Sequence, residues 1–450
     1  MADAPAPPQQ PTAEDISNEL EGMDVDDDLL RDDDGEAMEE VEDDASIAES
    51  DDEDLGLKET DALLTFDKHE GAVYCVSVSK NGDILSGGGD DRAWLQPGPL
   101  GEDQARRAIC LEGHGDSVTA CGFSHDDAMA ATGAYDGSVK LWDASTGSLL
   151  RTLEGPGDVE WLGWHPKGDV VLCGACDGTL WMWLATSGAC MRVFAGHDGA
   201  VLCGGFTCDG KKIVSGSADG SIRVWNPRKG ACAHAFLPHK GGPPAQNAHI
   251  VMTQGAVSCL AFHPTDPDLV LGGAEDGCGV VVHCSTKRVL CRLQHAPTRY
   301  DDDDTDADAG AAVVSVAIAQ NGWCATGGAD GHVKVWDISG PLPRERCALG
   351  TGGAVVSIAW HPSQLKLVAC SADGIISAWD ARDGTSLIKL RGHADAPLCM
   401  APFWPGDAVV TAGDDRSVCV FRVPPVDLPR PPPGSAPVPA PAPAPMPPAV

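Results

Sequence analysis

The chain has few basic residues for its length. It is 450 residues long and carries 31 lysines and arginines against 67 aspartates and glutamates, which gives a formal net charge of −36 at pH 7. Such a charge repels the phosphates of nucleic acid and the headgroups of an anionic membrane. We therefore expect the protein to bind neither of them directly, and the charge favours a basic protein as partner.

Long apolar runs are also missing. No stretch reaches the roughly 18 continuous apolar residues of a membrane-spanning helix, so we expect no membrane span. The N-terminus is acidic and rich in proline, and it lacks the basic start and the apolar core of a secretory signal peptide. Without such a signal, the 18 cysteines indicate a reducing compartment. We expect the protein in the cytoplasm, and the sequence leaves the nucleus open as a second location.

The spacings that bind zinc are absent as well. Cys173 and Cys176 form one Cys-x-x-Cys pair, and Cys203 and Cys208 lie close together, but no second such pair and no paired histidines lie nearby. Most of the cysteines fall in expected strands, where cysteine behaves as a small apolar residue. We therefore expect no metal and no cofactor.

What the chain does contain is a repeat of about 42 residues, in which Gly-His, an apolar stretch, Asp-Gly and Trp-Asp follow one another. This period and order are typical of the WD40 repeat, which forms one four-stranded blade of a β-propeller. We predict an all-β propeller of eight blades. Seven blades is the alternative, if the first unit, where Gln96 stands in place of the usual tryptophan, forms no blade. The eight units are marked by the turn aspartates Asp90, Asp136, Asp177, Asp219, Asp276, Asp330, Asp373 and Asp415.

Composition divides the chain into three parts. Residues 1–61 hold 25 acidic residues, two basic ones and no aromatic, so we expect a disordered acidic leader. Residues 424–450 are mostly proline and alanine and predict an extended, disordered tail. The propeller should occupy 62–423. Its last segment, Val418–Val423, matches a third strand, so we expect Ala62–Phe66 to supply the fourth strand and close the ring.

A trio of His, Ser or Thr, and Asp recurs within the repeats. A single trio would suggest nucleophilic catalysis, but a propeller has no use for several identical nucleophile sites. We interpret the trio, together with the Trp of the repeat, as a hydrogen-bond network inside each blade. We therefore expect no catalytic residue and no enzyme. The clearest sets are His114, Thr132, Asp136 and Trp142, and His197, Ser215, Asp219 and Trp225.

The residues beside this network vary from unit to unit. In a propeller, the connection ahead of each first strand and the turn that carries the Asp open on the same face, where loops are free to bind a ligand. We predict an acidic collar with aromatic anchors that receives a peptide rich in Arg and Lys. The alternative is a solvated face of ordinary turn carboxylates. The candidates are Glu70, Tyr74, Asp116, Tyr135, Asp158, Glu160, Trp161, Asp198, Glu275, Asp395 and Asp414.

Several stretches, taken in order, resemble one family. They are Leu63–His69, Gly87–Ala93, Gly113–Thr119 and, as the most specific parts, Asp158–Pro166 and Trp181–Trp183. In these stretches the chain resembles the angio-associated migratory cell protein family, which includes the fungal chaperone dedicated to one large-subunit ribosomal protein. The resemblance implies an eight-bladed propeller whose acidic face holds a basic ribosomal-protein segment until it is delivered to the maturing subunit.

We therefore expect a monomeric, non-enzymatic chaperone that binds a basic segment by charge complementarity. One alternative is a substrate receptor of a cullin-type ubiquitin ligase, because Trp379-Asp380-Ala381-Arg382 matches a short motif of such receptors. A general signalling scaffold is another. The acidic loop Tyr300–Gly310 and the Pro/Ala tail match nothing in the family and have no assigned role.

Overall fold

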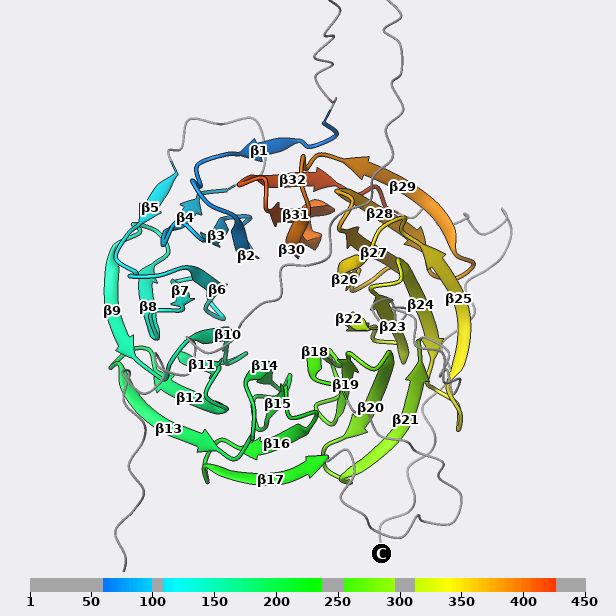
Figure 1. Ribbon diagram of the computed structural model, residues 1–450, viewed down its shortest axis with the longest axis horizontal. Coiled ribbons are helices and arrows are strands. Elements are labelled where there is room, and N and C mark those ends of the chain that lie inside the picture. The colour runs from blue at the N-terminus through cyan, green and yellow to red at the C-terminus, as the bar shows by residue number, and fades with distance from the viewer. Residues whose placement is uncertain (1–59, 99–107, 237–254, 296–311, 426–450) are drawn as a thin grey trace, which may run out of the picture. The chain divides into compact units, whose positions relative to one another are not determined.

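The described strands of this computed structural model form eight four-stranded antiparallel sheets, arranged as blades around a central opening (Figure 1). The structure describes residues 60–98, 108–236, 255–295 and 312–425. The prediction of eight blades is confirmed and the alternative of seven is wrong, because the unit of Asp90 forms a complete blade. The described ranges contain one 3-10 helix, Trp404–Gly406, and no α-helix. None of their helices has the length and apolar character needed to cross a membrane.

Each of the first seven blades consists of four strands that are consecutive in the chain. Blade 1 contains β2 (Val73–Val78), β3 (Ile84–Gly88), β4 (Ala93–Gln96) and β5 (Ile109–Leu111), and blade 2 contains β6 (Val118–Phe123), β7 (Met129–Ala134), β8 (Ser138–Asp143) and β9 (Leu149–Glu154). Blade 3 contains β10 (Val159–Trp164), β11 (Val170–Ala175), β12 (Thr179–Leu184) and β13 (Ala189–Ala195). Blade 4 contains β14 (Val201–Phe206), β15 (Ile213–Ser217), β16 (Ile222–Asn226) and β17 (Ala231–Phe236). Blade 5 contains β18 (Val257–Phe262), β19 (Leu269–Ala274), β20 (Cys278–His283) and β21 (Arg288–Gln294). Blade 6 contains β22 (Val313–Ile318), β23 (Trp323–Gly328), β24 (His332–Asp337) and β25 (Arg344–Gly350). Blade 7 contains β26 (Val355–Trp360), β27 (Lys366–Ser371), β28 (Ile375–Asp380) and β29 (Thr385–Arg391).

The eighth blade joins the two ends of the described chain. Its strands β30 (Pro397–Phe403), β31 (Ala408–Gly413) and β32 (Val418–Arg422) are followed, at the outer edge, by β1 (Leu64–Phe66). Strand β1 pairs antiparallel with β32, with Thr65 opposite Cys419. The prediction that the segment before the first blade closes the ring is therefore confirmed.

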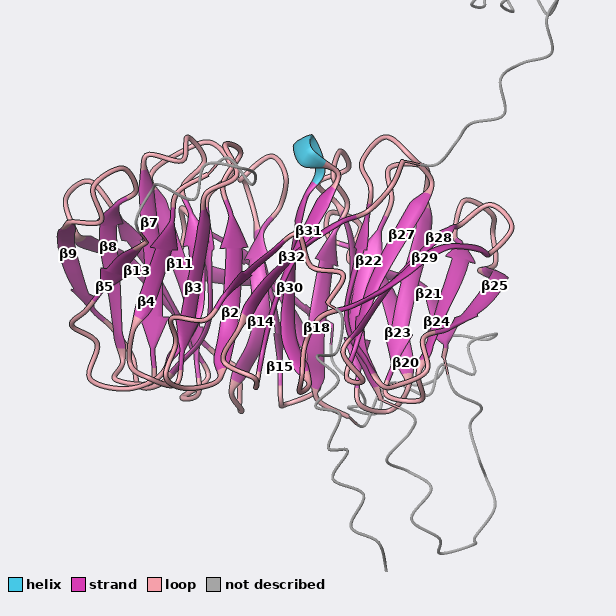
Figure 2. Cartoon of the chain, turned by 90° about the horizontal axis from the view of Figure 1, so that it is seen from above, coloured by secondary structure: helices cyan, strands magenta, loops and turns pink. Residues whose placement is uncertain are grey.

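The loops gather at two opposite rims of the ring (Figure 2). One rim holds the turns that carry the eight aspartates and the connections that lead into each inner strand; we call it the Asp-turn face. The other rim holds the remaining turns, including Trp404–Gly406, which is drawn as a short helix in Figure 2; we call it the opposite face. Because the Asp turn and the connection before the inner strand meet on this face in every blade, residues from several blades can contribute to one site there.

A bulge recurs near the start of every inner strand. The pairing register shifts between the first and third residues, as between Val73 and Cys75 in β2 and between Val313 and Ser315 in β22. A bulge turns the extra residue away from the regular alternation of the strand. The second residue of each inner strand is thereby placed at the inner edge of the Asp-turn face, beside the central opening.

The core lies between neighbouring blades. Val159 of blade 3, for example, packs with Val139 and Leu141 of blade 2, and Trp225 of blade 4 packs with Leu172 and Leu180 of blade 3. Each buried side chain of this size stabilises the fold by about 1.5–3 kcal/mol. No blade can therefore bury both of its faces without a neighbour on each side.

Three predictions lie largely outside the described residues. The acidic leader (1–61) and the Pro/Ala tail (424–450) reach the described ranges only at 60–61 and 424–425, and the loop Tyr300–Gly310 is not described at all.

The closure of the ring yields a test by truncation. Removing residues 1–59 leaves β1 in place, so the thermal unfolding midpoint should stay close to that of the full chain. Removing residues 1–67 deletes β1 and its hydrogen bonds to β32. At about 1 kcal/mol for each bond, we expect a loss of about 3–5 kcal/mol in the free energy of unfolding, measured by chemical denaturation. We also expect faster aggregation, because the edge of β32 is then exposed. Equal stability of the two truncations would contradict the role assigned to β1.

Candidate protein-binding face

A hydrogen bond between a histidine and the turn aspartate holds the Asp-turn face together in blades 1, 2, 4, 6 and 8. In blade 4, His197 Nδ1 lies 3.0 Å from Asp219 Oδ2, and its Nε2 lies 2.7 Å from Ser215 Oγ. The indole Nε1 of Trp225 donates to the same hydroxyl at 2.8 Å. In blade 2 the corresponding distances among His114, Asp136, Thr132 and Trp142 are 3.3, 2.7 and 2.9 Å. The imidazoles are fully buried, so the histidines are framework and are not presented to a ligand.

Blade 6 has a complete network whose histidine the sequence analysis did not include. His295 lies 2.7 Å from Thr326 Oγ1 and 3.2 Å from Asp330 Oδ1, and Trp336 Nε1 donates to Thr326 at 3.0 Å. His295 and Asp330 are 35 residues apart, whereas the pairs in blades 2 and 4 are 22 apart. The longer spacing hid the residue. Its position directly after the outer strand β21 is the signal that could have found it.

The protonation of these histidines differs between blades. Burial lowers the pKa of His114, His197 and His295 below the ordinary value. In blade 8, burial also acts to lower the pKa of His393, but its hydrogen bonds to Asp415 and Cys419 outweigh that effect and raise the pKa to about 9. His393 and Asp415 are 3.0 Å apart and form a buried ion pair at neutral pH.

The residues predicted to bind a partner all lie on the Asp-turn face. Glu160 and Trp161 are half-buried, and the other nine candidates are exposed. They stand in the connections before the inner strands, in the Asp turns, or in the first residues of the inner strands. Their distribution around the ring is uneven.

Four of the candidates come together from three neighbouring blades. They are Tyr74 of blade 1, Tyr135 of blade 2, and Asp158 and Glu160 of blade 3, which we call the acidic–aromatic patch. Burial, followed by the charges of Glu160 and Asp158, raises the pKa of Tyr135, and Tyr74 contributes to the same shift. Burial and the charge of Asp158 likewise raise the pKa of Glu160. Both tyrosines are 41% exposed, so their rings remain open to a ligand.

The remaining acidic candidates lie outside this patch, and two of them interact with other groups of the protein. Glu70 lies 3.4 Å from the guanidinium of Arg92. Asp116 accepts a hydrogen bond from the backbone of Ser117 at 2.7 Å. The others stand before or within blades 4, 5 and 8: Asp198, Glu275, Asp395 and Asp414.

Trp161 does not lie where an exposed aromatic anchor would. A Cβ added to Gly174 would come within 2.3 Å of the indole Nε1, and one added to Gly204 would come within 2.3 Å of Cζ2. The ring therefore packs between blades 3 and 4, in space that these two glycines leave open, and it belongs to the core cluster there. The expectation of an exposed anchor at Trp161 is wrong, because the third residue of an inner strand faces the neighbouring blade. The other seven blades have a small residue there: Cys75, Ala120, Cys203, Cys259, Ser315, Ser357 and Cys399.

The second residue of each inner strand makes up a further part of the face, most of which the sequence analysis missed. On blades 4, 6, 7 and 8 this residue is apolar, and we call the set the apolar rim. Val314 is exposed and the other three members are half-buried. On blades 1, 2, 3 and 5 the same position is Tyr, Thr, Glu and Ser. Aligning the repeats on their inner strands would have shown this division. The apolar rim consists of Leu202, Val314, Val356 and Leu398.

Comparisons with known proteins bear on the identity of this propeller. The family described as WD domain, G-beta repeat, matches residues 61–95, 106–143, 147–183 and 188–226, and the family described as Nucleolar protein 10-like, N-terminal domain, matches 243–429. The angio-associated migratory cell proteins of Homo sapiens and Canis lupus familiaris are each 31% identical to the chain over 371 residues, which is 81% of this chain and 80% of theirs.

Solved structures of similar fold include Sqt1. The Saccharomyces cerevisiae protein has a TM-score of 0.69 at 21% identity, and the match covers 81% of this chain and all of that one. Sqt1 of Chaetomium thermophilum, solved bound to the N-terminus of the ribosomal protein L10, has a TM-score of 0.69 at 20% identity with the same coverage. These likenesses show that the chain shares the fold of Sqt1.

The raised pKa of His393 predicts a dependence of stability on pH. A histidine whose pKa is about 9 in the folded chain and near 6.5 in the unfolded chain stabilises the fold fully below pH 6.5. That stabilisation, up to about 3 kcal/mol, is lost as the pH rises from 6.5 to 9. We expect the free energy of unfolding to fall less over this range in a His393→Gln variant than in the natural chain.

Cysteine thiols also titrate at high pH and affect the stability of all variants alike. The contribution of His393 is therefore obtained from the difference between variants. A His197→Gln variant is the matched control, since burial lowers the pKa of His197, in contrast to the raised pKa of His393. It should keep the full pH dependence. Identical slopes for all three proteins would contradict a charged His393.

Proposed function

The chain belongs to the angio-associated migratory cell protein family, and we propose that it is a chaperone that holds a basic segment of a large-subunit ribosomal protein on its Asp-turn face in the cytoplasm. The WD40 propeller is a protein-binding module, and the proposal concerns what it binds. The observation that carries it is the acidic–aromatic patch, where two carboxylates and two exposed tyrosines from three blades meet. The fold shared with an Sqt1 that was solved bound to the N-terminus of ribosomal protein L10 supports it.

The chemistry of the patch suits arginine and lysine. Carboxylates such as Asp158 and Glu160 accept paired hydrogen bonds from a guanidinium. The faces of Tyr74 and Tyr135 attract a cation within about 6 Å. Burial has already removed part of the water around Glu160, so an arriving cation finds an acceptor that is partly desolvated and held in place by β10.

The apolar rim adds a second requirement. Leu202, Val314, Val356 and Leu398 surround the other part of the opening, where apolar side chains of a ligand can leave water. The best ligand is therefore a segment that carries both basic and apolar residues. A uniformly basic peptide would use only the acidic–aromatic patch.

The leader contributes through its charge. Residues 1–61 carry 25 acidic and two basic residues. A dense negative charge attached to the propeller attracts a basic partner from a distance and raises the rate of encounter.

No contact in the described residues favours the ligase-receptor alternative. The Nε of Arg382 lies 2.9 Å from each carboxylate oxygen of Asp380 in its own turn. This pair lowers the pKa of Asp380, so the guanidinium is already engaged within the blade.

A peptide with the N-terminal sequence of ribosomal protein L10 from the same organism tests the proposal. We expect the full chain to bind it, with an affinity that falls steeply between 50 and 500 mM salt in fluorescence anisotropy titrations. Reversing two charges of the patch, in an Asp158→Lys/Glu160→Lys variant, should weaken binding at least about 100-fold, since two charge-assisted bonds are lost and each contributes about 1.5–3 kcal/mol.

The control makes the same change of charge elsewhere. Asp266→Lys/Asp383→Lys alters two exposed carboxylates in turns of the opposite face, between β18 and β19 and between β28 and β29, and it should bind within about threefold of the natural chain, an effect of less than 1 kcal/mol. If both variants bound the peptide equally weakly, the loss would come from the net charge of the protein and not from the patch. Unchanged affinity in the patch variant, or an affinity independent of salt, would show that the patch is not the site.

A further inference from the structure

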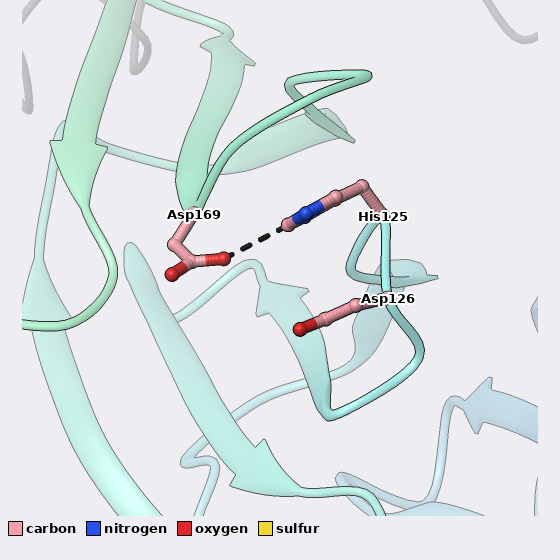
Figure 3. Close-up of side chains that lie close together, drawn as sticks. All are labelled: His125, Asp126 and Asp169. Atoms are coloured by element: carbon pink, nitrogen blue, oxygen red, sulfur yellow. Dashed lines mark ion pairs between the residues drawn. The ribbon is translucent and has the colours of Figure 1, made fainter.

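Two turns on the opposite face bring His125, Asp126 and Asp169 together (Figure 3). His125 and Asp126 stand in the turn between β6 and β7 of blade 2, and Asp169 stands directly before β11 of blade 3. One ligand atom of each residue lies within 4.8 Å of the ligand atoms of the other two. The cluster therefore joins two blades on the face opposite the one that holds the acidic–aromatic patch.

Two atoms of this cluster lack a hydrogen bond. Nδ1 of His125 and Oδ1 of Asp169 are both shielded from solvent and have no hydrogen-bond partner, although the side chains are 31% and 32% exposed. These two atoms face each other at 3.6 Å, the pair that Figure 3 marks with a dashed line. That separation is too long for a hydrogen bond. Shielded polar atoms without a hydrogen-bond partner are costly, so each of the two requires an explanation.

The turns that carry the cluster are held firmly by contacts on other atoms. Ser124 Oγ donates to Asp126 Oδ1 at 2.8 Å, which lowers the pKa of Asp126 and keeps it ionised. The backbone N–H of Lys80, in blade 1, donates to Asp127 at 2.9 Å, and the ammonium of Lys80 donates to the backbone carbonyl of His125. The carbonyl of Asp169 accepts a hydrogen bond from Ala185 at 2.8 Å. Nδ1 of His125 and the carboxylate of Asp169 are left to face each other.

We propose that His125, Asp126 and Asp169 bind a divalent transition-metal cation, such as Zn²⁺ or Co²⁺, that links blades 2 and 3. Imidazole nitrogen and carboxylate oxygen bind Zn²⁺ at about 2.0–2.2 Å. Two such ligands on a tetrahedral ion are roughly 3.4 Å apart by simple geometry, close to the observed 3.6 Å. An imidazole ligand selects this class of ion over Ca²⁺ and Mg²⁺, which prefer oxygen. Three protein ligands leave a position for water.

The competing explanation is an ion pair between protonated His125 and Asp169. The two explanations differ in whether the imidazole carries a proton. An ion pair requires a proton on the imidazole, whereas a metal requires its removal. A site held only by the ion pair would therefore show no dependence on added metal.

Titration of the full chain with Co²⁺, after removal of bound metal with a chelator, tests the site. We expect the natural chain to bind one equivalent more than His125→Gln or Asp169→Asn, with visible bands of nitrogen and oxygen coordination. Cysteine coordination would give a separate thiolate-to-metal band. Asp126→Asn should weaken the site at least tenfold. The carboxylates of the leader bind Co²⁺ equally in all variants and cancel in the comparison.

Asp127→Asn is the matched control. Asp127 lies in the same turn but outside the cluster, and it has a positive φ of 58°, a conformation that asparagine adopts well. This variant should bind as the natural chain does. Addition of Co²⁺ should also raise the unfolding midpoint of the natural chain and the control but not of the ligand variants, which separates loss of the site from loss of the fold. Equal stoichiometry in all variants, or no metal-dependent rise in the natural chain, would overturn the proposal.

Discussion

The pairing of β1 with β32 is the contact on which the rest of the propeller depends. Each blade exposes two apolar faces, and only a closed ring covers both faces of all eight. Thr65 opposite Cys419, and its neighbours on either side, complete the eighth blade with a segment that lies about 350 residues earlier in the chain. The core between blades 8 and 1 contains residues of β1, β2 and β31, so the closure also fixes the inner strands around the opening.

Closure alone would leave the turns free to move, and the buried networks remove that freedom. In blades 2, 4 and 6 a histidine contacts the aspartate of the Asp turn and the hydroxyl of a Ser or Thr. The Trp of the third strand donates to the same hydroxyl. With its backbone fixed in this way, a blade can vary the residues beside the network at little cost in stability.

The sequence alone predicted the features that recur from repeat to repeat. It did not predict contacts between residues of different blades. The eight turn aspartates and the closing segment Ala62–Phe66 follow from periodicity alone. His295 was missed because additional residues lie between it and its blade. Trp161 was misplaced because the space it fills is made by Gly204 of the next blade, 43 residues away. The same holds for His125 and Asp169, whose proximity no local spacing indicates.

The division of the Asp-turn face has a consequence for how a ligand is held. Long-range attraction to carboxylates speeds encounter and is weakened by salt, whereas contacts that exclude water mainly slow dissociation. The acidic–aromatic patch lies on blades 1 to 3 and the apolar rim on blades 4 and 6 to 8, so the two effects arise on different arcs of the ring that adjoin at blades 8 and 1 and at blades 3 and 4. A segment lying across the opening must place its basic residues on one side and its apolar residues on the other. For the segment proposed above, the arrangement of residues around the ring would therefore select the direction in which it lies, in addition to its charge.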